Sequence, residues 1–575
     1  MQTAHNSKTT AASAPAVPTS TSYNSTHESY TIGWICPLVI ELAAARQMLD
    51  EEHPTLRHVA GDNNTYVLGR VCGHNVVLAG LPAGQMGTTP AAVVATRMLS
   101  TFPNIRFGLL VGIGGGIPSE RHDIRLGDIV VSEPKGTFGG VVQFDLGKRT
   151  TDGFERTGQL NRPPPALLTA LTTLKSGHIF GGSDKVPTYV EGVRDKYPGM
   201  ADQLVYTPSK DRLFEAEYIH PNGKRTCEDC DEGALKKKRA RMQDKPVIRY
   251  GTIASSNQVM KHGGERDQLR DQFDALCFEM EAAGLMNHFP CIVIRGICDY
   301  SDSHKNDNWQ LYAATVAAAY AKEFLEVMAP AAVEATSLAT EICEVDREMK
   351  EKREVLDWLS QSNYRERQAD IAKKHLKGTG QWFVNAPRYL EWRSSSNKTL
   401  FCPGIPGAGK SVMMSLVIKH LSSELESNLS ASAYLYYEYG RQTEQDVEHL
   451  LASLIQQLSE YQNSIHKSLQ TLFDGYKKNE GRPTYEELTT VFSSISKSFD
   501  RVFIVIDALD ECNENVRERL LRSIRKAQSG AEISLIVTSR RVPNVEDEFK
   551  EELHQAIEAS EGDIETFLDC RIHEL

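Results

Sequence analysis

The stretch GIPGAGKS at residues 404–411 decides the fold of the C-terminal part of this chain. It matches the pattern G-x-x-x-x-G-K-S and lies between the apolar run 399–402 and the amphipathic run 411–421. A strand, a glycine-rich loop and a helix in that order hold the phosphates of a nucleoside triphosphate. The stretch therefore predicts an α/β domain that binds such a nucleotide.

The residue types within this loop fit phosphate binding. Glycine lets backbone N–H groups close around phosphate oxygens, and we expect this of Gly404, Gly407 and Gly409. Lys410 is expected to reach the terminal phosphates, and Ser411 is expected to supply a magnesium ligand.

Two later runs predict the rest of this site. The run RVFIVID ends in Asp507, where a carboxylate can hold magnesium, and Asp510 and Glu511 follow it. The run SLIVTS is followed by Arg540, which either senses the terminal phosphate or begins a surface loop. Both interpretations of Arg540 stay open.

The composition bounds the class of protein. A chain of 575 residues should hold at least two domains of about 100 to 200 residues each. The 64 Lys and Arg against 76 Asp and Glu give a net charge of -12, which argues against nucleic acid or an anionic membrane as partners. The 11 cysteines form no paired framework, and no apolar run approaches the roughly 18 residues of a membrane span. We expect a soluble, cytoplasmic protein.

The pattern along the chain predicts four segments. Residues 1–29 hold few large apolar side chains and are expected to be disordered. Residues 30–329 alternate β-rich runs with helical patterns, which predicts a mostly parallel sheet flanked by helices. Residues 330–377 read as a helical linker, and residues 378–575 as a second α/β domain. The strands expected in that second domain are 399–402, 431–437, 501–507 and 534–539.

A charged insertion at residues 224–245 interrupts the first domain. We expect a solvated loop, with the basic run 236–241 as loop charge rather than a nuclear address. Cys227 and Cys230 form a C-x-x-C pair, but no second Cys or His pair stands nearby at zinc spacing. The sequence therefore favours a pair that binds no metal.

Six runs of the first domain carry a family resemblance. The apolar run 107–111 is expected to be a strand that leads into a glycine-rich turn, and a site-like cluster precedes the run CIVIR. In order, the runs are IGWICPLVIEL, VGIGGGIP, RLGDIVVSE, IASSNQVMK, FEMEAAG and RGICDYSD. Together they make residues 30–329 resemble the nucleoside phosphorylase and nucleosidase family, which includes the purine and uridine phosphorylases. The resemblance implies an α/β sandwich that cleaves the bond between a base and ribose.

The resemblance assigns three catalytic residues. It implies that Asp299 is the general acid that protonates the leaving purine and that Glu281 grips the ribose hydroxyls. Glu41 falls where nucleosidases place the glutamate that positions the attacking water. By sequence alone, Asp299 could instead cap a turn, and Glu279 and Glu281 could be solvated residues at a helix start.

The resemblance also implies the residues that bind the substrate: Gly114, Gly115, Asn257, Val259, Met260 and Met280. A phosphorylase would need arginines around a phosphate ion, and Arg46, Arg97 and Arg106 match no phosphate motif of the family. We therefore expect hydrolysis. Ile113 stands where nucleosidases often carry a hydroxyl group, which leaves the substrate open.

The C-terminal part, residues 356–575, resembles the NACHT and nephrocystin-like signalling ATPases. The resemblance rests on GIPGAGKS, IDALDEC, the TSR strand and the upstream GTGQWFVNAPRYLEW. It implies ATP and Mg²⁺ as cofactors and a homo-oligomer as the active form. Few residues follow the TSR strand, so we expect the C-terminal sensor repeats of that group to be absent or truncated.

Both resemblances together predict an NLR-like protein of innate immunity type, whose ATP-binding module gates a purine nucleosidase. Some domains of this family that are fused to immune-type switches resemble nucleosidases that degrade ATP. This precedent suggests a nucleoside, or a nucleotide such as ATP, as the substrate. The alternatives are a phosphorylase that uses phosphate and a non-catalytic purine-sensing domain on an oligomerising switch.

Overall fold

The computed structural model describes residues 25–566, apart from residues 152, 181–183, 222–225, 242–244, 363, 377, 425–429, 438–439, 441–444, 478–480, 559 and 561. The chain divides into two compact units. We call Met1–Asp346 unit 1 and Arg347–Leu575 unit 2. The boundary falls inside helix α9 (Ala339–Leu359), and each unit is described by itself.

Unit 1 is an α/β unit. Its strands are β1 (Ile32–Cys36), β2 (Glu51–His53), β3 (Tyr66–Val71), β4 (His74–Gly80), β5 (Phe107–Gly116), β6 (Ile129–Ser132), β7 (Val141–Gln143), β8 (Gly147–Thr150), β9 (Gly153–Arg156), β10 (Ile248–Ser255), β11 (Ala275–Glu279) and β12 (Cys291–Asp299). Its helices before α9 are α1 (Val39–Gln47), α2 (Thr88–Thr101), α3 (Pro165–Ile179), α4 (Val186–Lys196), α5 (Gly263–Phe273), α6 (Ala282–Leu285), α7 (Gln310–Glu326) and α8 (Pro330–Glu334).

The main sheet of unit 1 has the order β11-β10-β6-β12-β5-β1-β4-β3-β2. The pairs β4–β1, β1–β5 and β5–β12 are parallel, as the sequence predicts. The pairs β6–β12 and β11–β5 are antiparallel. Because β11 pairs with both β10 and β5, five strands close into a ring, which the local pattern of the sequence could not show.

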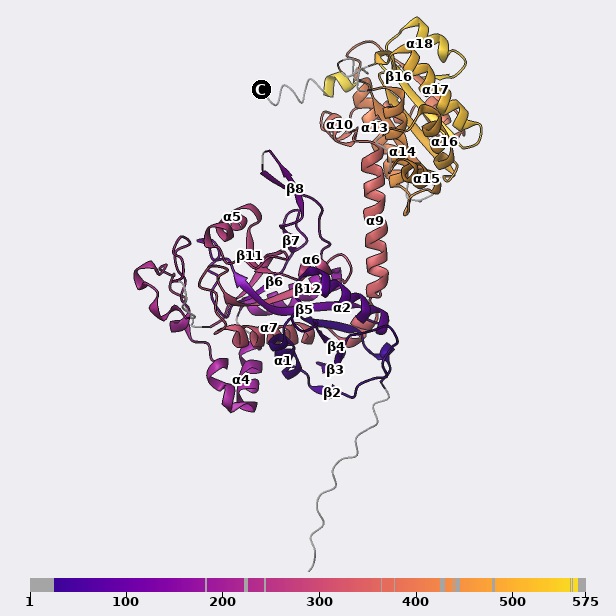
Figure 1. Ribbon diagram of the computed structural model, residues 1–575. Coiled ribbons are helices and arrows are strands. Elements are labelled where there is room, and N and C mark those ends of the chain that lie inside the picture. The colour runs from indigo at the N-terminus through magenta and orange to yellow at the C-terminus, as the bar shows by residue number, and fades with distance from the viewer. Residues whose placement is uncertain are drawn as a thin grey trace, which may run out of the picture. The chain divides into compact units, whose positions relative to one another are not determined.

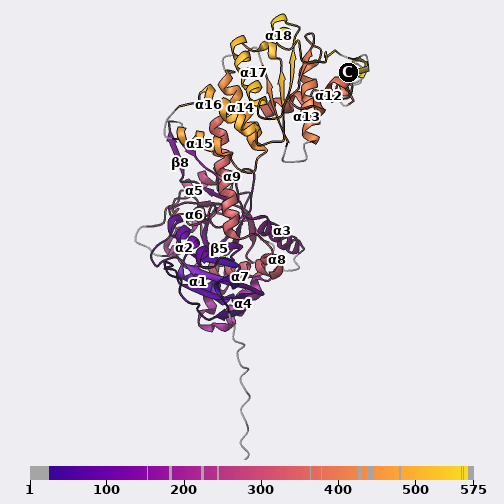
Figure 2. The same ribbon diagram turned by 90° about the vertical axis from the view of Figure 1, so that its right-hand side faces the viewer.

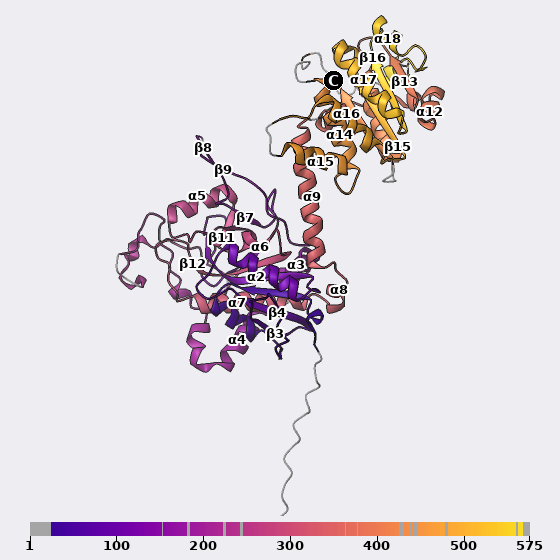
Figure 3. The same ribbon diagram turned by 45° about the vertical axis from the view of Figure 1, so that its right-hand side comes forward.

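The central strands β1 and β12 are largely apolar, with Arg295 and Asp299 of β12 as exceptions. Every residue of β1 and β12 is buried, as expected of strands covered on both faces. Helices α1 and α7 lie below β12 and β5 in Figure 1, and α5 and α6 lie above these two strands. The alanine-rich α7 is almost entirely buried and packs against β12 and β5. A separate ribbon of β8 and β9 projects from the body of unit 1 (Figure 3).

The expectation of a glycine-rich turn after residue 111 is wrong. Strand β5 continues through the glycines to Gly116, and it pairs there with β11 and β12. Glycine is needed because side chains approach this end of the strand closely. A Cβ atom on Gly112 would lie 2.2 Å from a carboxylate oxygen of Glu41.

The expected tail of residues 1–29 also needs a correction at its end. Residues 1–24 lie outside the described part of the chain. His27–Ser29 form a 3-10 turn, and the ring of His27 lies 5.3 Å from that of Phe102. These polar residues are held by hydrogen bonds, such as the one that Asn104 donates to the carbonyl of Glu28.

The expectation of a solvated loop at residues 224–245 is wrong for three described residues. Cys230 is buried, and Lys238 forms an ion pair with Asp211 at 2.6 Å. Arg241 pairs with the fully buried Asp128 at 2.7 Å. The basic run thus neutralises acidic groups that are distant in the sequence.

Unit 2 contains a five-stranded parallel sheet of order β14-β15-β16-β13-β17. The four predicted strands are confirmed as β13 (Thr399–Pro403), β14 (Ser430–Tyr436), β15 (Arg501–Asp507) and β16 (Ile533–Ser539), and β17 (Leu553–His554) is added. The helices are α10 (Tyr364–Ala372), α11 (Gln381–Val384), α12 (Pro387–Ser394), α13 (Lys410–Glu424), α14 (Val447–Glu460), α15 (Lys467–Tyr476), α16 (Tyr485–Ser496), α17 (Glu514–Gln528) and α18 (Pro543–Glu548).

Helices cover both faces of this sheet. Figure 2 shows the strands between α14, α16 and α17 on one side and α12 and α13 on the other. Two separate apolar clusters correspond to these two faces. The parallel order brings the carboxyl ends of β13, β15 and β16 to one edge, where the P-loop lies.

The segment 330–377 contains α8, α9 and α10, but its ends are parts of the two cores. Val333 and Ala339 pack in the core of unit 1, and Val355 and Leu356 pack in that of unit 2. In the part of the chain that is described, no helix is long and apolar enough to cross a membrane.

Candidate functional site

A buried arginine organises the acidic residues of unit 1. Arg295, in the middle of β12, is 1% exposed. Its Nη2 atom forms an ion pair with Glu279 and lies 3.3 Å from an oxygen of Glu281, and its Nη1 atom lies 3.9 Å from an oxygen of Glu41. The structure thus brings together Glu41 and Glu281, which are 240 positions apart in the sequence.

Backbone N–H groups fix Glu41 at the start of α1. Its two carboxylate oxygens accept hydrogen bonds from Leu38 at 2.6 Å and from Ile113 at 2.7 Å. Burial raises the pKa of Glu41 to about 7, with the negative charge of Glu281 adding to this effect and Arg295 opposing it. A carboxylate with a pKa near neutrality is suited to accept a proton from water.

Glu281 is held between β11 and the short helix α6. Its carboxylate accepts a hydrogen bond from the backbone of Gly87 at 3.1 Å, at the start of α2. Gly87 has a φ of 100°, a conformation that side chains other than glycine rarely adopt. Burial raises the pKa of Glu281, and Arg295 opposes that rise.

Glu279 is buried rather than solvated, which removes the interpretation of a surface helix start. It accepts hydrogen bonds from the backbone of Glu281 and Ala282 at 3.0 and 2.9 Å and pairs with Arg295. Three carboxylates therefore face one guanidinium group. If all are ionised, the cluster carries an excess of negative charge, which would stabilise a positive charge that develops on a bound sugar.

Asp299 ends strand β12 next to the glycines of β5. It is buried, its Oδ1 atom accepts a hydrogen bond from Ser301 at 2.8 Å, and its Oδ2 atom lies 2.9 Å from Nζ of Lys305. Asp299 is paired with Gly115 in the sheet, and a Cβ atom on Gly115 would lie 2.8 Å from its carboxylate. Although burial lowers the pKa of Lys305, Asp299 raises it above its ordinary value, so that Lys305 stays protonated.

The predicted substrate-binding residues lie in different surroundings. Gly114 and Gly115 line the end of β5 beside β12, and Asn257 accepts hydrogen bonds from the backbone and hydroxyl of Thr88 at 3.0 Å. Met260 packs in a small apolar cluster, whereas Val259 is 47% exposed. Met280 is half-buried between the two acids.

The three arginines considered for a phosphate ion contact other groups. Arg46 pairs with Glu52 at 2.8 Å, and Arg106 donates to the carbonyl of Thr336 at 2.7 Å. Arg97 lies close enough to Asp62 to help lower the pKa of that carboxyl, where burial acts in the opposite direction. None of these described contacts places an arginine beside Glu281 or Asp299.

The P-loop of unit 2 has the backbone that its sequence predicts. Gly407 and Gly409 have φ values of 81° and 83°, in the region that favours glycine. Nothing lies within 4 Å of a Cβ atom built on either residue, so the loop borders open space. Lys410 donates hydrogen bonds to the carbonyl groups of Gly404 and Ile405, both at 2.9 Å.

The predicted magnesium ligands meet at the edge of the sheet. The hydroxyl of Ser411 lies 2.5 Å from Oδ2 of Asp507, and Thr538 donates to Oδ1 of Asp507 at 2.6 Å. Burial raises the pKa of Asp507, and these two hydrogen bonds oppose the rise. A hydroxyl and a carboxylate at this position fit the oxygen ligands that Mg²⁺ takes beside a P-loop.

Arg540 forms an ion pair with Asp510. Its backbone N–H donates to Asp510 at 2.9 Å, and its side chain forms an ion pair with the same carboxylate. Although burial would raise it, the hydrogen bonds from Arg540 hold the pKa of Asp510 below its usual range. Glu511 lies near enough to Lys410 to raise the pKa of that lysine, which burial lowers.

Comparisons with known proteins agree with both units. A family model described as the phosphorylase superfamily matches residues 31–344. The chain belongs to the phosphorylase superfamily. A second model, for the N-terminal region of nephrocystin 3, matches residues 378–540. The chain is therefore a phosphorylase-superfamily unit fused to a nephrocystin-like P-loop unit.

Three relatives extend this result. A nucleotide-binding leucine-rich repeat (NLR)-like protein of Hyaloscypha variabilis is 46% identical over 310 residues, which are 53% of this chain and 30% of that protein. A 5'-methylthioadenosine/S-adenosylhomocysteine nucleosidase of Mycobacterium bovis is 25% identical over 304 residues, which are 52% of this chain and 96% of that enzyme. The vegetative incompatibility protein HET-E-1 of Podospora anserina is 25% identical over 183 residues, which are 30% of this chain and 13% of that protein. The chain thus spans about a third of its NLR-like relative and less of HET-E-1.

Sequence reasoning missed three groups that contact the predicted acids: Arg295, Lys305 and Gly87. Arg295 begins the quoted run RGICDYSD, and Lys305 stands three residues after it. A basic residue inside an otherwise apolar strand was the available signal for Arg295. A charge is buried there only if opposite charges neutralise it. No local signal pairs Gly87 with Glu281.

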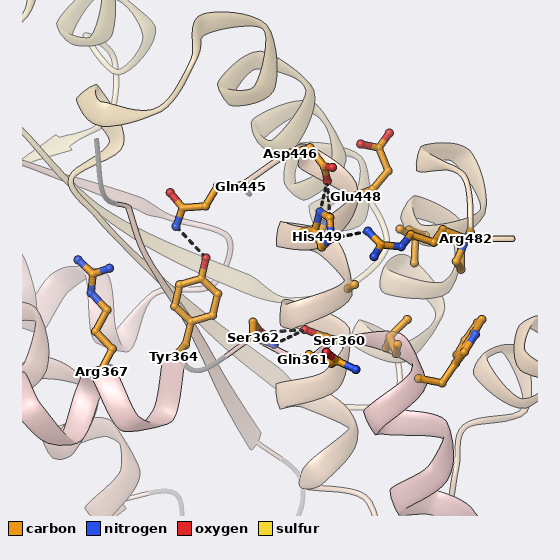
Figure 4. Close-up of a pocket in the computed structure, with 15 residues that line it drawn as sticks. Ser360, Gln361, Ser362, Tyr364, Arg367, Gln445, Asp446, Glu448, His449 and Arg482 are labelled. Carbon is orange, nitrogen blue, oxygen red and sulfur yellow. Dashed lines mark hydrogen bonds and ion pairs between the residues drawn. The ribbon is translucent and has the colours of Figure 1, made fainter. Parts of the chain in front are cut away.

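A cavity of about 660 Å³ lies elsewhere in unit 2 (Figure 4). None of the described residues that line it belongs to the P-loop. Figure 4 shows that His449 bridges Asp446 and Arg482, with distances of 2.8 Å to each. This cavity is therefore separate from the predicted nucleotide site.

Proposed function

We propose that unit 1 is a purine nucleosidase that hydrolyses the N-glycosidic bond of a nucleoside or nucleotide. The observation that carries this proposal is the preformed cluster of Glu41 and Glu281 around Arg295, beside a separate buried acid, Asp299. Glycosidic hydrolysis needs an acid for the leaving base, a base for water and negative charge near the sugar.

Each acid would have one task in the reaction. As the N-glycosidic bond breaks, its electron pair moves to the base, and Asp299 delivers a proton to the imidazole side of the purine. Water then attacks the anomeric carbon and gives a proton to Glu41. Glu281 would hold the ribose hydroxyls and, with the excess charge of the cluster, stabilise the cationic sugar. Exchange of protons with solvent would then return Asp299 and Glu41 to their starting states.

The site favours water over phosphate. Glu41 would act as the water-positioning base, and its pKa of about 7 suits that role. The arginines that could have bound phosphate are paired with Glu52 or hydrogen-bonded to Thr336. The similarity to a bacterial nucleosidase over 304 residues supports the same choice.

We also propose that unit 2 binds ATP with Mg²⁺ and gates unit 1 through assembly of copies of the chain. Gly407 and Gly409 leave room for phosphates, Lys410 would contact the terminal phosphates, and Ser411 with Asp507 would hold the magnesium ion. The bound nucleotide would supply the γ-phosphate that a switch of this type senses. The NLR-like relative supports a switch of this kind.

The test is to incubate the full chain with adenosine, inosine, AMP and ATP, with and without phosphate, and to quantify free base by chromatography. We expect base release without phosphate and no sugar 1-phosphate. The absence of base release from every substrate, with and without ATP and Mg²⁺ present, would refute the nucleosidase. Release that depends on phosphate would replace it with a phosphorylase.

A further inference from the structure

The insertion of unit 1 brings together three residues whose side chains can bind a metal. A ring nitrogen of His220 and the sulfur atoms of Cys227 and Cys230 all lie within 4.8 Å of one another. Both cysteines are free, and Cys230 is buried. His220 could not be predicted as a metal ligand, because it stands outside the usual spacing of a zinc motif.

A fourth residue stands beside this group. The ring of His304 lies 5.3 Å from that of His220, and its backbone carbonyl lies 3.9 Å from the sulfur of Cys227. His304 is 8% exposed, and neither of its ring nitrogens makes a hydrogen bond. A buried imidazole without hydrogen bonds is costly unless it binds a ligand. The Nδ1 atom of His304 is 3.4 Å from Asp302, too long for a good hydrogen bond.

We propose that His220, Cys227, Cys230 and His304 form a structural zinc site. Two thiolates and two imidazoles are the ligand set of many closed zinc sites. Bonds of about 2.3 Å to sulfur and about 2.0 Å to nitrogen place tetrahedral ligand atoms about 3.3 to 3.8 Å apart. The first three ligands therefore need to close by only about 1 Å, whereas the ring nitrogens of His304 lie outside that 4.8 Å group and must approach further. Zinc displaces the thiol protons, which are released to solvent.

Neighbouring polar groups also orient the proposed ligands. The ring nitrogens of His220 lie 3.0 and 3.1 Å from the carbonyl groups of Pro221 and Thr226. One nitrogen would leave its carbonyl group to bind the metal, while the other donates a hydrogen bond. Arg212 donates to the carbonyl of Cys227 at 2.7 Å and fixes the loop.

The site would fasten the insertion to the loop that follows Asp299. The backbone N–H of His220 donates to Ser303 at 2.9 Å, and the ring of Phe214 stacks on His304 at 4.1 Å. Residue 305, next to His304, is the lysine that pairs with Asp299. A metal here would therefore hold Lys305 against the acid of the proposed reaction without touching substrate.

The experiment measures zinc in the tag-free full chain purified under reducing conditions, by plasma mass spectrometry. We expect about one zinc per chain, near zero in Cys227→Ser and Cys230→Ser, and an unchanged value in Cys343→Ser, a half-buried thiol on α9. Cobalt substitution should give thiolate charge-transfer bands and the d–d bands of a tetrahedral ion. His304→Asn should change those d–d bands.

A second measurement keeps the proposal falsifiable if the serine variants fail to fold. Removal of zinc from the wild-type chain by a chelator should increase hydrogen exchange in residues 211–241 and 300–305, and added zinc should reverse it. A wild-type chain that keeps no zinc after incubation and desalting would overturn the proposal. A disulfide between Cys227 and Cys230 in the reduced preparation would also overturn it, and an unchanged cobalt spectrum in His304→Asn would remove the fourth ligand.

Discussion

In unit 1 the acidic groups are held by backbone N–H donors and one buried arginine, whereas in the P-loop the groups expected to bind the ligand contact one another. Glu41 and Glu281 are fixed by Ile113 and Gly87 before any substrate is present. Ser411 contacts Asp507, and Arg540 contacts Asp510. The first site is preorganised, whereas a nucleotide at the proposed P-loop site would have to replace these internal partners. The proposed catalysis and switching would require this difference.

The largest effect is expected from a substitution of the proposed acid in unit 1. Asp299→Asn keeps the size of the side chain but cannot donate the proton to the base, so kcat for base release should fall by about 10² to 10⁴. Nucleotide binding at the P-loop should not change. Asp307→Asn, an exposed position in the same loop, is the matched control and should keep full activity. Full activity in Asp299→Asn would show that the acid is a different group.

The second prediction addresses the P-loop. Lys410→Ala removes the cation that would contact the terminal phosphates, and ATP affinity should fall about 10- to 100-fold, the loss typical of hydrogen bonds to a charged group. Lys419→Ala, an exposed lysine on the same helix α13, should bind ATP normally. Calorimetric titration of the full chain with ATP and Mg²⁺ measures both. Equal affinities would argue against the proposed nucleotide site.

The third prediction sharpens the comparison through pH. Glu41 must be ionised to accept a proton, and its pKa is raised to about 7. The rate constant kcat/KM should therefore fall about tenfold for each pH unit below 7. The rate is measured from pH 5 to 8.5, with circular dichroism as a check that the chain stays folded. A rate that is constant down to pH 5 would exclude Glu41 as the base.

The smallest expected effect concerns Arg540. Its ion pair with Asp510 is half exposed on the arginine side, so Arg540→Ala should lower the free energy of unfolding by less than about 1 kcal/mol. If the arginine exchanges Asp510 for the γ-phosphate, ATP should protect the wild-type chain from thermal unfolding more than ADP does. The variant should lose this difference. If ATP protects more than ADP by the same amount in the wild type and in the variant, Arg540 does not sense the γ-phosphate.

The sequence predicts local features better than distant contacts. The P-loop and its strands are contiguous, so residues 399–411 and Asp507 could be placed from the pattern alone. The identities of Glu41, Glu281 and Asp299 came from a family resemblance, and the structure shows all three buried. Arg295 was missed because the pairing of β11 with β5 and the position of α1 beside the end of β5 bring the three glutamates to it. The insertion was misread because Asp128 and Asp211, which neutralise its basic residues, lie far away in the sequence.

The most direct test of the central claim follows the oxygen atom of the product. The full chain is incubated with the purine substrate it cleaves in H₂¹⁸O with phosphate present, and the released sugar is analysed by mass spectrometry. We predict one ¹⁸O atom at the anomeric position, free purine base, and loss of both products in Asp299→Asn. Formation of a sugar 1-phosphate without ¹⁸O, or no cleavage of any purine nucleoside or nucleotide, would contradict the account.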